Sequence, residues 1–378
     1  MKRLAIITTH PIQYNAPFFK QLAQSQKLQI KVFYTLGDTT KGYFDQKFQK
    51  QIAWDIPLLE AYQYTFVGNI ATKPSTQKFF GIKNPKLIRE IKQWQPNAIV
   101  IYGWRHFSHF SAMLYFKGKT PILFRGDSTL IDINSKFKLY IKTKILSIIY
   151  KFIDYTLYVG TNNKNYFKQC SLKDQQLIFV PHAVDNKRFE DTDGNYQQKA
   201  NLWRKQLAID NNQKTVLYVG KFEPIKNLFL LLNCAKKLPQ TKFILVGNGS
   251  LEKQLKQSAP QNVIFLPFQN QSQMPIVYRL ANIFALCSFS ETWGLAINEA
   301  MACGLAIVAS NNVGCAVDLV QNGINGYIFQ NNNLDDLVGK ISLALKNCQT
   351  LSQNSKQIIQ NWNYNKGVEQ IEKLLSNL

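Results

Sequence analysis

The stretch that most strongly indicates the fold is SFSETWGLAINEAMACG, at residues 288–304. The apolar run 283–286 before it predicts a buried strand, and residues 288–290 form the loop after that strand. Residues 295–303 favour a helix, and Gly304 is suited to end it. Glu291 therefore lies on a loop at a helix N-terminus, whereas Glu299 lies about one turn inside the helix. Eight residues of helical rise separate the two carboxylates by roughly 10 Å.

That separation is about the reach from a hexose across a diphosphate to a ribose. The N–H groups at a helix N-terminus, together with the helix dipole, favour an anion such as a diphosphate. The two glutamates alone would be a weak signal. Their setting between a strand and a helix predicts a nucleotide-sugar site.

Length and composition bound the class of protein. A chain of 378 residues is expected to form two domains, and an apolar content of 46% excludes wholesale disorder. The six cysteines show no C-x-x-C spacing, which favours a reducing, cytoplasmic compartment. The apolar run 4–7 is too short for a signal peptide or a membrane span, and no other segment reaches about 18 apolar residues. We therefore expect a protein that does not cross a membrane.

The net charge of +22 is unevenly placed. Residues 1–190 hold 28 Lys and Arg against 11 Asp and Glu, a net +17, whereas residues 191–378 hold 17 against 12, a net +5. A basic half predicts a polyanionic partner: an anionic membrane surface, a phosphate-bearing substrate or nucleic acid.

Strand-like apolar runs alternate with longer amphipathic segments along the whole chain. The expected strands lie at 4–8, 29–34, 98–102, 122–125, 156–159 and 176–180 in the first half, and at 215–219, 242–246, 263–266, 283–286, 306–309 and 326–329 in the second. Such alternation predicts an α/β architecture of parallel sheets with helices on both faces. Each half resembles a doubly wound, Rossmann-like domain, and its ligands should bind at the carboxyl edges of the strands.

The domain boundary is expected in the polar, turn-rich segment 190–198. The predicted N-terminal domain is 1–190 and the predicted C-terminal domain is 199–361. The last segment, 362–378, is expected to be helical.

Two loops of the second half carry candidate phosphate ligands. The loop 219–227, VGKFEPIKN, places Lys221 and Lys226 between a strand and a helix, where lysines can stabilise a departing diphosphate. The loop 246–250, VGNGS, is a glycine-rich turn that contains Gly247. The alternatives are two solvated lysines and a plain turn.

Taken together, these motifs resemble the C-terminal domain of the retaining glycosyltransferases of family 4, which have the GT-B fold. About 160 residues match in order, including VIFLPFQNQSQMPIVYRLANIFALCS at 263–288 and VGCAVDLVQNGINGYIF at 313–329. FVPHAVD at 179–185 resembles the end of the family's N-terminal domain, and Trp362 with the last helix resembles the segment that crosses back to that domain. The resemblance implies two Rossmann-like domains facing a central cleft, the first of them closed by the helix 362–378.

The resemblance also implies roles for particular residues. Glu291 would bind hydroxyls of the donor sugar, and Lys221 and Lys226 would hold the diphosphate. Further positions are implied in binding the ribose, the diphosphate or the base: Glu299, Gly294, Leu295, Gly247 and Leu266. The chain departs from the family at Ala306, where proline is usual, and at Lys221, where arginine is usual. Lysine keeps the charge but loses the bidentate fork.

Two loops of the first half carry candidate acceptor or cleft residues. The loop 9–15, THPIQYN, contains His10 and Gln13 and resembles a subset of the family. His10 would contact the acceptor or the donor phosphate, or would only cap a turn. The loop 103–109, GWRHFSH, contains Arg105 and predicts a wall of the cleft. Its two histidines have no third ligand nearby, so we expect no metal site.

A third loop, FRGDS at 124–128, places Asp127 where the family usually has an active-site histidine. A carboxylate there would bind a sugar hydroxyl or stabilise positive charge in an oxocarbenium-like transition state. The alternative is that Asp127 caps the next helix. Arg125 is a candidate ligand for an acceptor phosphate.

Residues 136–155, KFKLYIKTKILSIIYKFIDY, interleave five lysines with apolar side chains and predict a basic amphipathic helix. Either the helix lies on an anionic membrane surface, or its apolar side is core and its lysines are solvated. The charge of the N-terminal half favours the membrane, and with it a peripheral position on the inner face of the plasma membrane.

We therefore expect a metal-independent, retaining hexosyltransferase that needs no cofactor beyond its nucleotide-sugar co-substrate. Its acceptor would be a glycan or a lipid-linked precursor in bacterial surface polysaccharide or glycolipid synthesis. Two alternatives stay open: a nucleotide-sugar epimerase of the same fold, and a non-catalytic, basic nucleic-acid-binding protein. No segment resembles a nucleic-acid-binding module, so we expect no nucleic-acid partner.

Overall fold

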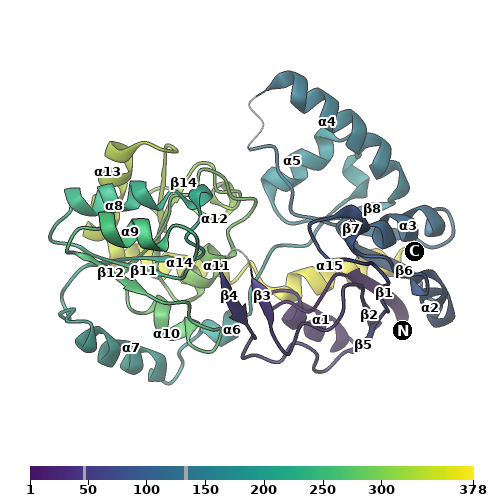
Figure 1. Cartoon of the computed structure of the whole chain (residues 1–378), viewed down its shortest axis with the longest axis horizontal. Coiled ribbons are helices and arrows are strands. Elements are labelled where there is room, and N and C mark those ends of the chain that lie inside the picture. The colour runs from purple at the N-terminus through teal and green to yellow at the C-terminus, as the bar shows by residue number, and fades with distance from the viewer. Residues whose placement is uncertain (46–47, 132–134) are drawn as a thin grey trace. The chain divides into compact units, whose positions relative to one another are not determined.

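The computed structural model describes residues 1–45, 48–131 and 135–378, which divide into two compact units (Figure 1). Unit 1 comprises Met1–Tyr43, Ile56–Pro181 and Tyr364–Leu378, and unit 2 comprises Phe44–Asp55 and His182–Asn363. These bounds differ from the sequence-based ones because two segments of the N-terminal half, 44–55 and 182–190, pack with unit 2. The segment 190–198, expected as a linker, also lies in unit 2, and a helix begins within it at Asn195.

Unit 1 is built on a parallel sheet whose described strands have the order β5-β2-β1-β6-β7-β8-β9. The strands are β1 (Lys2–Thr8), β2 (Leu28–Tyr34), β5 (Gln63–Phe66), β6 (Ala98–Tyr102), β7 (Ile122–Arg125), β8 (Tyr155–Tyr158) and β9 (Leu177–Phe179). The helices are α1 (Ala16–Ala23), α2 (Leu87–Trp94), α3 (Phe107–Phe116), α4 (Lys136–Ile149), α5 (Thr161–Gln169) and α15 (Tyr364–Ser376), with short 3-10 turns at Phe79–Gly81, Tyr150–Phe152 and Asp174–Gln176.

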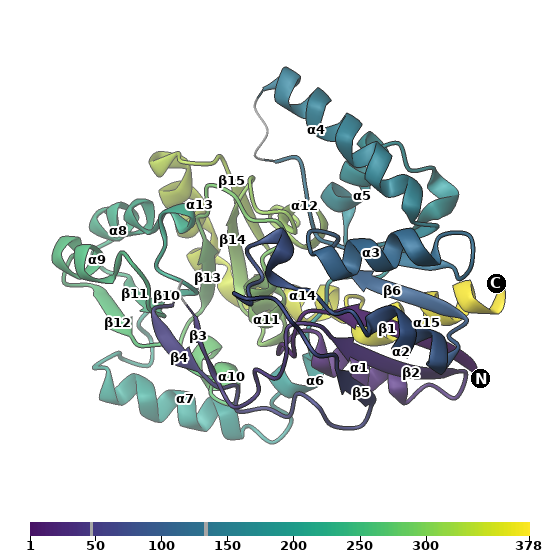
Figure 2. The same cartoon turned by 45° about the vertical axis from the view of Figure 1, so that its right-hand side comes forward.

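Unit 2 is built on a second parallel sheet, whose described strands have the order β12-β11-β10-β13-β14-β15 (Figure 2). The strands are β10 (Thr215–Val219), β11 (Lys242–Val246), β12 (Val263–Leu266), β13 (Ile283–Leu286), β14 (Ala306–Ser310) and β15 (Gly326–Phe329). The helices are α6 (Asn186–Phe189), α7 (Asn195–Gln206), α8 (Leu228–Lys237), α9 (Glu252–Ser258), α10 (Met274–Tyr278), α11 (Leu295–Ala302), α12 (Ala316–Leu319), α13 (Leu334–Lys346) and α14 (Cys348–Ile359), with a 3-10 turn at Pro224–Lys226. A separate pair, β3 (Tyr43–Asp45) and β4 (Lys50–Ile52), completes the set.

Both sheets run outward in two directions from their first strand, which is the doubly wound arrangement. In unit 1 the order reverses between β1 and β6, and in unit 2 it reverses between β10 and β13. The predicted fold class is therefore confirmed for each unit. Ligands of such sheets bind beyond the carboxyl ends of the strands at the point of reversal.

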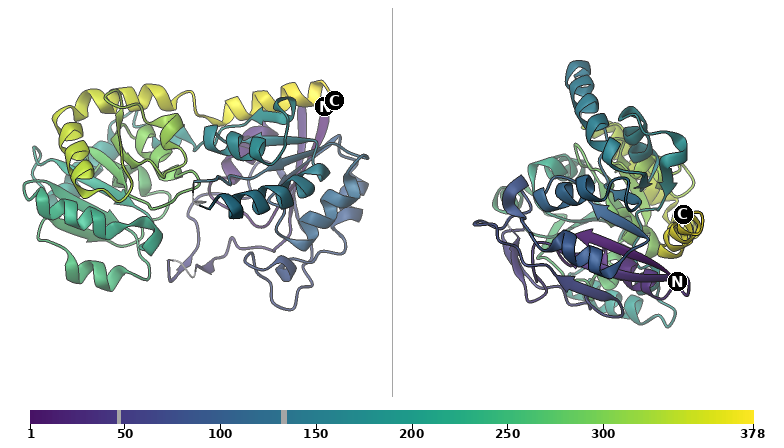
Figure 3. Two further views of the ribbon diagram at one scale, coloured as in Figure 1. Left: turned by 90° about the horizontal axis from the view of Figure 1, so that it is seen from above. Right: turned by 90° about the vertical axis from the view of Figure 1, so that its right-hand side faces the viewer.

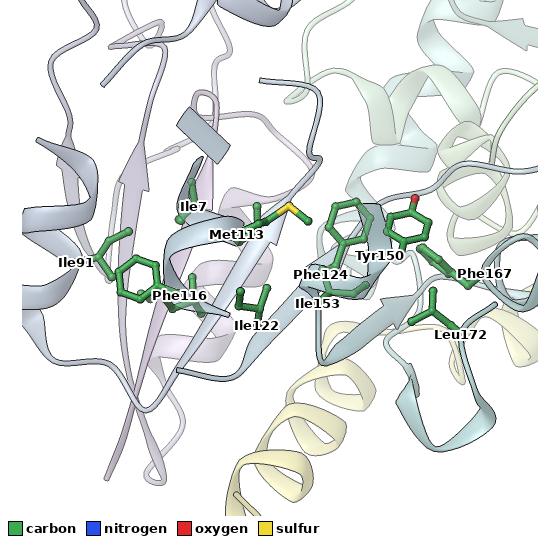
Figure 4. Close-up of a cluster of buried hydrophobic side chains, with 14 of the residues drawn as sticks. Ile7, Ile91, Met113, Phe116, Ile122, Phe124, Tyr150, Ile153, Phe167 and Leu172 are labelled. Carbon is green, nitrogen blue, oxygen red and sulfur yellow. The ribbon is translucent and has the colours of Figure 1, made fainter. Parts of the chain in front are cut away.

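The core of unit 1 consists of two layers of apolar side chains, one on each face of its sheet. Figure 4 shows part of one layer, in which Met113 and Phe116 of α3 lie near Ile122 and Phe124 of β7. The other layer includes Phe19 of α1 and four buried side chains of α15: Val368, Ile371, Leu374 and Leu375. Helix α15 thus completes unit 1 from the far end of the chain (Figure 3).

In the part of the chain that the structure describes, no helix is both long enough and apolar enough to span a bilayer.

Candidate functional site

The predicted donor residues of unit 2 gather at its point of strand reversal. The loop with Lys221 and Lys226 follows β10, and the loop with Glu291 follows β13. Because β10 and β13 are neighbouring parallel strands, their carboxyl ends meet at one edge of the sheet. The two loops also join directly, since the backbone N–H of Phe289 donates to the carbonyl of Ile225 at 2.9 Å.

Lys226 and Glu291 form an ion pair across this junction. Their side chains are only 18% and 20% exposed, so both charges lie partly out of water. Paired charges in such a place attract each other more strongly than exposed ones do. The pair holds the carboxylate that we expect on the donor sugar against a lysine that we expect on the diphosphate.

The backbone around Glu291 is clamped to the segment that follows β14. Its N–H donates to the carbonyl of Asn312 at 3.1 Å, and its carbonyl accepts from the N–H of Gly314 at 2.9 Å. A Cβ at position 314 would lie 1.9 Å from the carbonyl oxygen of Thr292, so the close approach requires glycine there. The loop therefore presents Glu291 from a rigid backbone.

Helix α11 begins immediately after this loop. Gly294 is its N-cap and has a φ of +100°, a backbone conformation that residues with a side chain rarely adopt. Leu295 is the first helical residue. Glycine has no side chain with which to cap this N-terminus. The N-terminal N–H groups that we expect to face a diphosphate thus start at the edge of the sheet where Lys226 and Glu291 lie.

Glu299 lies one turn inside α11 and is only 2% exposed. One of its carboxylate oxygens accepts a hydrogen bond of 2.7 Å from the hydroxyl of Tyr278, the last residue of α10. The hydroxyl fixes the orientation of the carboxylate, which is what a ribose ligand requires.

The glycine-rich turn after β11 packs against the lysine loop. A Cβ on Gly247 would lie 1.9 Å from the carbonyl oxygen of Gly220, so the two turns can approach only without a side chain there. The N–H of Phe222 donates to the carbonyl of Asn248 at 2.9 Å. The N–H of Gly247 donates to the carbonyl of Leu266 at 3.0 Å. Gly247 and Leu266 thus link β10, β11 and β12 at their carboxyl ends.

Lys221 contacts a segment that comes from far earlier in the sequence. Its Nζ lies 3.0 Å from a carboxylate oxygen of Asp45 and 4.6 Å from the centre of the Phe48 ring. Both lysines of the loop are therefore paired with a carboxylate.

In unit 1, His10 and Gln13 follow β1, the strand at the point of reversal. Nδ1 of His10 lies 2.9 Å from the hydroxyl oxygen of Thr9, and its ring meets the ring of Tyr43 edge-on. Burial, and then the charge of His106, lowers the pKa of His10 to about 4. His10 is therefore neutral at pH 7. Gln13 is half-buried.

Arg105 follows β6, the other strand at this reversal, and its side chain is exposed. His109, in contrast, is fully buried: Nδ1 lies 3.1 Å and 3.0 Å from the carbonyl oxygens of Tyr102 and Gly103, and Nε2 lies 2.9 Å from the hydroxyl of Thr35. These bonds hold His109 inside the unit. Among residues 1–45, 48–131 and 135–378, no group of three or more His, Cys, Asp or Glu side chains is placed to hold a metal ion.

Arg125 is buried at the end of β7. Its guanidinium donates to the carbonyls of Leu157, Val180 and Pro181 at 3.4, 2.8 and 3.4 Å. This arrangement favours a structural role over the acceptor-phosphate contact predicted from the sequence, because the donors already bind backbone groups of the interior.

Asp127 is exposed on the loop after β7. It does not cap the next helix, because Ser135 caps α4 by accepting from the N–H of Lys138. The capping alternative is therefore wrong for this aspartate. Asp127 stays a predicted sugar or transition-state ligand.

Comparison with known proteins identifies the part of the chain that carries the predicted donor residues. The family of glycosyl transferases group 1 matches residues 199–362, which include Lys221, Lys226, Glu291 and Glu299. This part of the chain is a glycosyl transferases group 1 domain. The recognition of the family from the sequence motifs is thus confirmed.

Curated relatives align with part of the chain rather than with the whole of it. A D-inositol 3-phosphate glycosyltransferase of Mycolicibacterium smegmatis is 31% identical over 189 residues, which cover 45% of this chain and 43% of that protein. A protein of the same name from Mycobacterium sp. strain KMS is 33% identical over 155 residues, 38% of this chain and 34% of the relative. The chain thus spans less than half the length of these relatives.

Solved structures match over the full length. Sucrose-phosphate synthase from Thermosynechococcus elongatus has a TM-score of 0.74 at 19% identity and covers 100% of this chain and 99% of its own. Anabaena HepE, solved in complex with UDP and glucose, has a TM-score of 0.72 at 17% identity and covers 100% of both chains. These likenesses show a GT-B-like fold.

Three residues near the site of the glycosyltransferase domain were given no role by the sequence analysis. Tyr278 and Gly314 lie in stretches that resemble the family, but their contacts with Glu299 and with the Glu291 loop were not predicted, and Asp45 lies 176 positions from the lysine it pairs with. None of these contacts follows from local pattern, because each depends on how the elements pack.

Proposed function

We propose that the protein is a retaining glycosyltransferase that moves a sugar from a nucleotide-sugar donor to a glycan or lipid-linked acceptor. The observation that carries the proposal is the Lys226–Glu291 pair beside the N-terminus of α11, at the point of strand reversal of a glycosyltransferase domain. A cation, a carboxylate and helix N–H groups at one sheet edge suit a diphosphate that is joined to a sugar.

The proposed reaction needs little covalent chemistry from the chain. Lys221, Lys226 and the N–H groups of α11 take up the negative charge of the departing nucleoside diphosphate. Glu291 binds hydroxyls of the sugar, and Glu299, held by Tyr278, binds the ribose. The acceptor hydroxyl attacks on the face that the diphosphate leaves, and a leaving phosphate oxygen accepts its proton. Retention of configuration rests on the family resemblance. So does the role of Asp127, which would bind a sugar hydroxyl or stabilise positive charge near the reacting carbon.

A binding screen tests the donor site. UDP, GDP, ADP and CMP, with their sugars, are added to the purified protein without metal, and thermal unfolding is followed. HepE binds UDP and glucose, so UDP is the first choice. We expect one nucleotide to raise the unfolding temperature, and Glu299→Gln to remove most of that shift. The glutamine can still accept from Tyr278, so the fold is retained. No shift with any nucleotide at millimolar concentration would overturn the assignment.

Acceptor dependence separates a transferase from an epimerase of the same fold. A transferase releases the nucleoside diphosphate faster when a suitable acceptor is present, whereas an epimerase interconverts nucleotide-sugars without one. Interconversion of nucleotide-sugars without release of the nucleoside diphosphate would contradict the transferase proposal but would be consistent with the donor site.

Peripheral binding to an anionic membrane is the second part of the proposal, and α4 supports it. Of its fourteen residues, all of them described, Leu146 alone is buried. Its exposed apolar residues Phe137, Ile141, Ile145 and Ile148 recur at intervals of three and four, which places them on one side of the helix. The core alternative does not account for this stripe.

The charge of α4 indicates the kind of surface. The helix contains four lysines and no acidic residue, and it projects from the rest of unit 1 (Figure 3, right). An apolar stripe flanked by lysines suits the boundary between headgroups and acyl chains of an anionic bilayer. Such a surface would bring a lipid-linked acceptor to unit 1.

A further inference from the structure

The contact that leads beyond the proposed function is the one between Lys221 and Asp45. Both oxygens of the Asp45 carboxylate lie within hydrogen-bond reach of the Lys221 Nζ, at 3.0 and 3.3 Å. The Asp45 side chain is 14% exposed and that of Lys221 26%, so the pair is largely shielded from water. The ring of Phe48, 4.6 Å from the same nitrogen, adds a cation–π contact.

The segment that carries Asp45 is anchored on unit 2 at its other end. The ring of Phe48 lies 5.1 Å from that of Phe268, just beyond β12, and the ring of Trp54 lies 6.1 Å from it. Asp55 accepts from the N–H of Ser272 at 3.0 Å. The described residues 44–45 and 48–55 therefore extend from the lysine loop after β10 to the residues that follow β12 (Figure 2).

This placement puts a carboxylate on the lysine that the proposed function assigns to the diphosphate. A carboxylate and a phosphate oxygen both accept hydrogen bonds from an ammonium group, but a diphosphate carries more charge and more acceptor oxygens. The carboxylate of an aspartate that is ion-paired with the lysine must be displaced before the lysine can bind the diphosphate.

We propose that Asp45 is a stand-in for the donor diphosphate. It holds Lys221 in place while the site is empty, and Lys221 exchanges the Asp45 carboxylate for the diphosphate when donor binds. Asp45 is thus a positioning residue that acts through Lys221 and weakens the binding of nucleoside diphosphates. The inference rests on the proposed function, because it takes Lys221 as a diphosphate ligand.

Calorimetric titration with matched nucleotides tests the inference. UDP and UMP are titrated into the wild type and into Asp45→Asn. Where UDP does not bind, the pairs GDP and GMP, and ADP and AMP, are used instead. Loss of an ion pair that competes with the ligand should tighten diphosphate binding roughly threefold to tenfold. Binding of the monophosphate, which reaches less far along the site, should change less than twofold. A role in folding alone would move both affinities together.

Two further variants serve as controls. Asp55→Asn removes the same charge from the same segment, but Asp55 binds Ser272 and pairs with no cation among the described residues, so diphosphate affinity should stay as in the wild type. In a Lys221→Ala background, Asp45→Asn should give no gain, because the coupling runs through the lysine. Asp45→Ser replaces the asparagine variant if thermal unfolding shows that the latter is not folded.

The outcomes separate this inference from the function on which it rests. If the wild type binds a nucleoside diphosphate and Asp45→Asn binds it no better, or gains equally for the monophosphate, the stand-in role is wrong and the donor site remains. If no variant binds any nucleotide, the donor site itself is wrong and the inference falls with it.

Discussion

At the scale of single residues, the proposed donor site depends on side chains that are held by other side chains. Glu291 is paired with Lys226, and Glu299 is bonded to Tyr278. A change at either glutamate therefore leaves a partner behind, and the choice of substitution decides whether function or stability is measured. Isosteric amides keep the hydrogen bonds, whereas alanine does not.

Glu291→Gln should lower turnover with little effect on folding. The amide keeps the shape but loses the charge that we propose binds the sugar, and we expect kcat/KM to fall by a factor of about 100, or roughly 3 kcal/mol of transition-state stabilisation. Initial rates with donor and acceptor measure the effect, and thermal unfolding checks the fold. Full activity in the variant would mean that Glu291 does not take part in binding the donor.

Glu299→Ala should be costly for stability in a way that Glu299→Gln is not. Alanine leaves the buried hydroxyl of Tyr278 without its carboxylate acceptor, at a cost of about 1–3 kcal/mol. The comparison is made by urea unfolding of the two variants. An equal fall in the free energy of unfolding of both variants would mean that the hydrogen bond from Tyr278 contributes little to stability.

The buried His109 predicts a loss of stability in mild acid. Burial, and then the charge of His106, lowers the pKa of His109 from 6.5 to about 4. The unfolded chain then binds a proton that the folded chain rejects, so the stability is complete above pH 6.5 and falls as the pH drops from 6.5 towards 4. Between pH 6.5 and 5 this histidine alone should cost about 2 kcal/mol. Urea unfolding of the wild type and His109→Gln measures it, and the two pH slopes should differ.

At the scale of elements, the sheets were predictable and the accessory pieces were not. All the strands predicted from apolar runs are present, because a strand buried on both faces leaves an unbroken apolar signature. The short strands β3, β4 and β5 lack such runs: KQI of β4, for example, has two exposed residues of three. Helix α7 was missed because its sequence, NYQQKANLWRKQ, begins in a polar turn-rich segment.

The same contrast holds for the candidate site. Lys221, Lys226 and Glu291 could be proposed from the sequence because they lie in motifs between a strand and a helix, and Glu299 because it lies one turn inside such a helix. Arg125 lies at the end of a strand, yet its guanidinium donates to carbonyls inside the unit, and the sequence does not distinguish the two cases. Burial of a charged side chain is decided by the carbonyls around it.

Helix α4 should bind vesicles through its apolar stripe. Replacing Ile141 and Ile145 by serine removes two exposed side chains, each expected to contribute about 2 kcal/mol when buried in lipid. Binding to vesicles of phosphatidylcholine with 30% phosphatidylglycerol, followed by sedimentation, should fall by at least about tenfold. Leu202→Ser makes the same kind of change on an exposed position of α7 and should have no effect. Equal binding of all variants would assign α4 another role.

At the scale of the whole molecule, nucleotide should protect the two units unequally. Its expected ligands lie in unit 2, so at a hundredfold excess over Kd the opening of β10, β13 and α11 should be suppressed by about 2.7 kcal/mol. Native-state hydrogen exchange should show a smaller effect in β1 and β6 of unit 1. Equal protection of both sheets would mean that the units open together.

The place of α15 has a consequence for how the protein is made. Four of its side chains form part of a core whose other members lie in the first half of the sequence. During synthesis, unit 1 waits with an uncovered apolar face while the ribosome translates more than 180 further residues. Unit 2 is completed earlier, although it starts later. A chaperone that shields nascent apolar surface should therefore be held by the first unit until the last helix emerges.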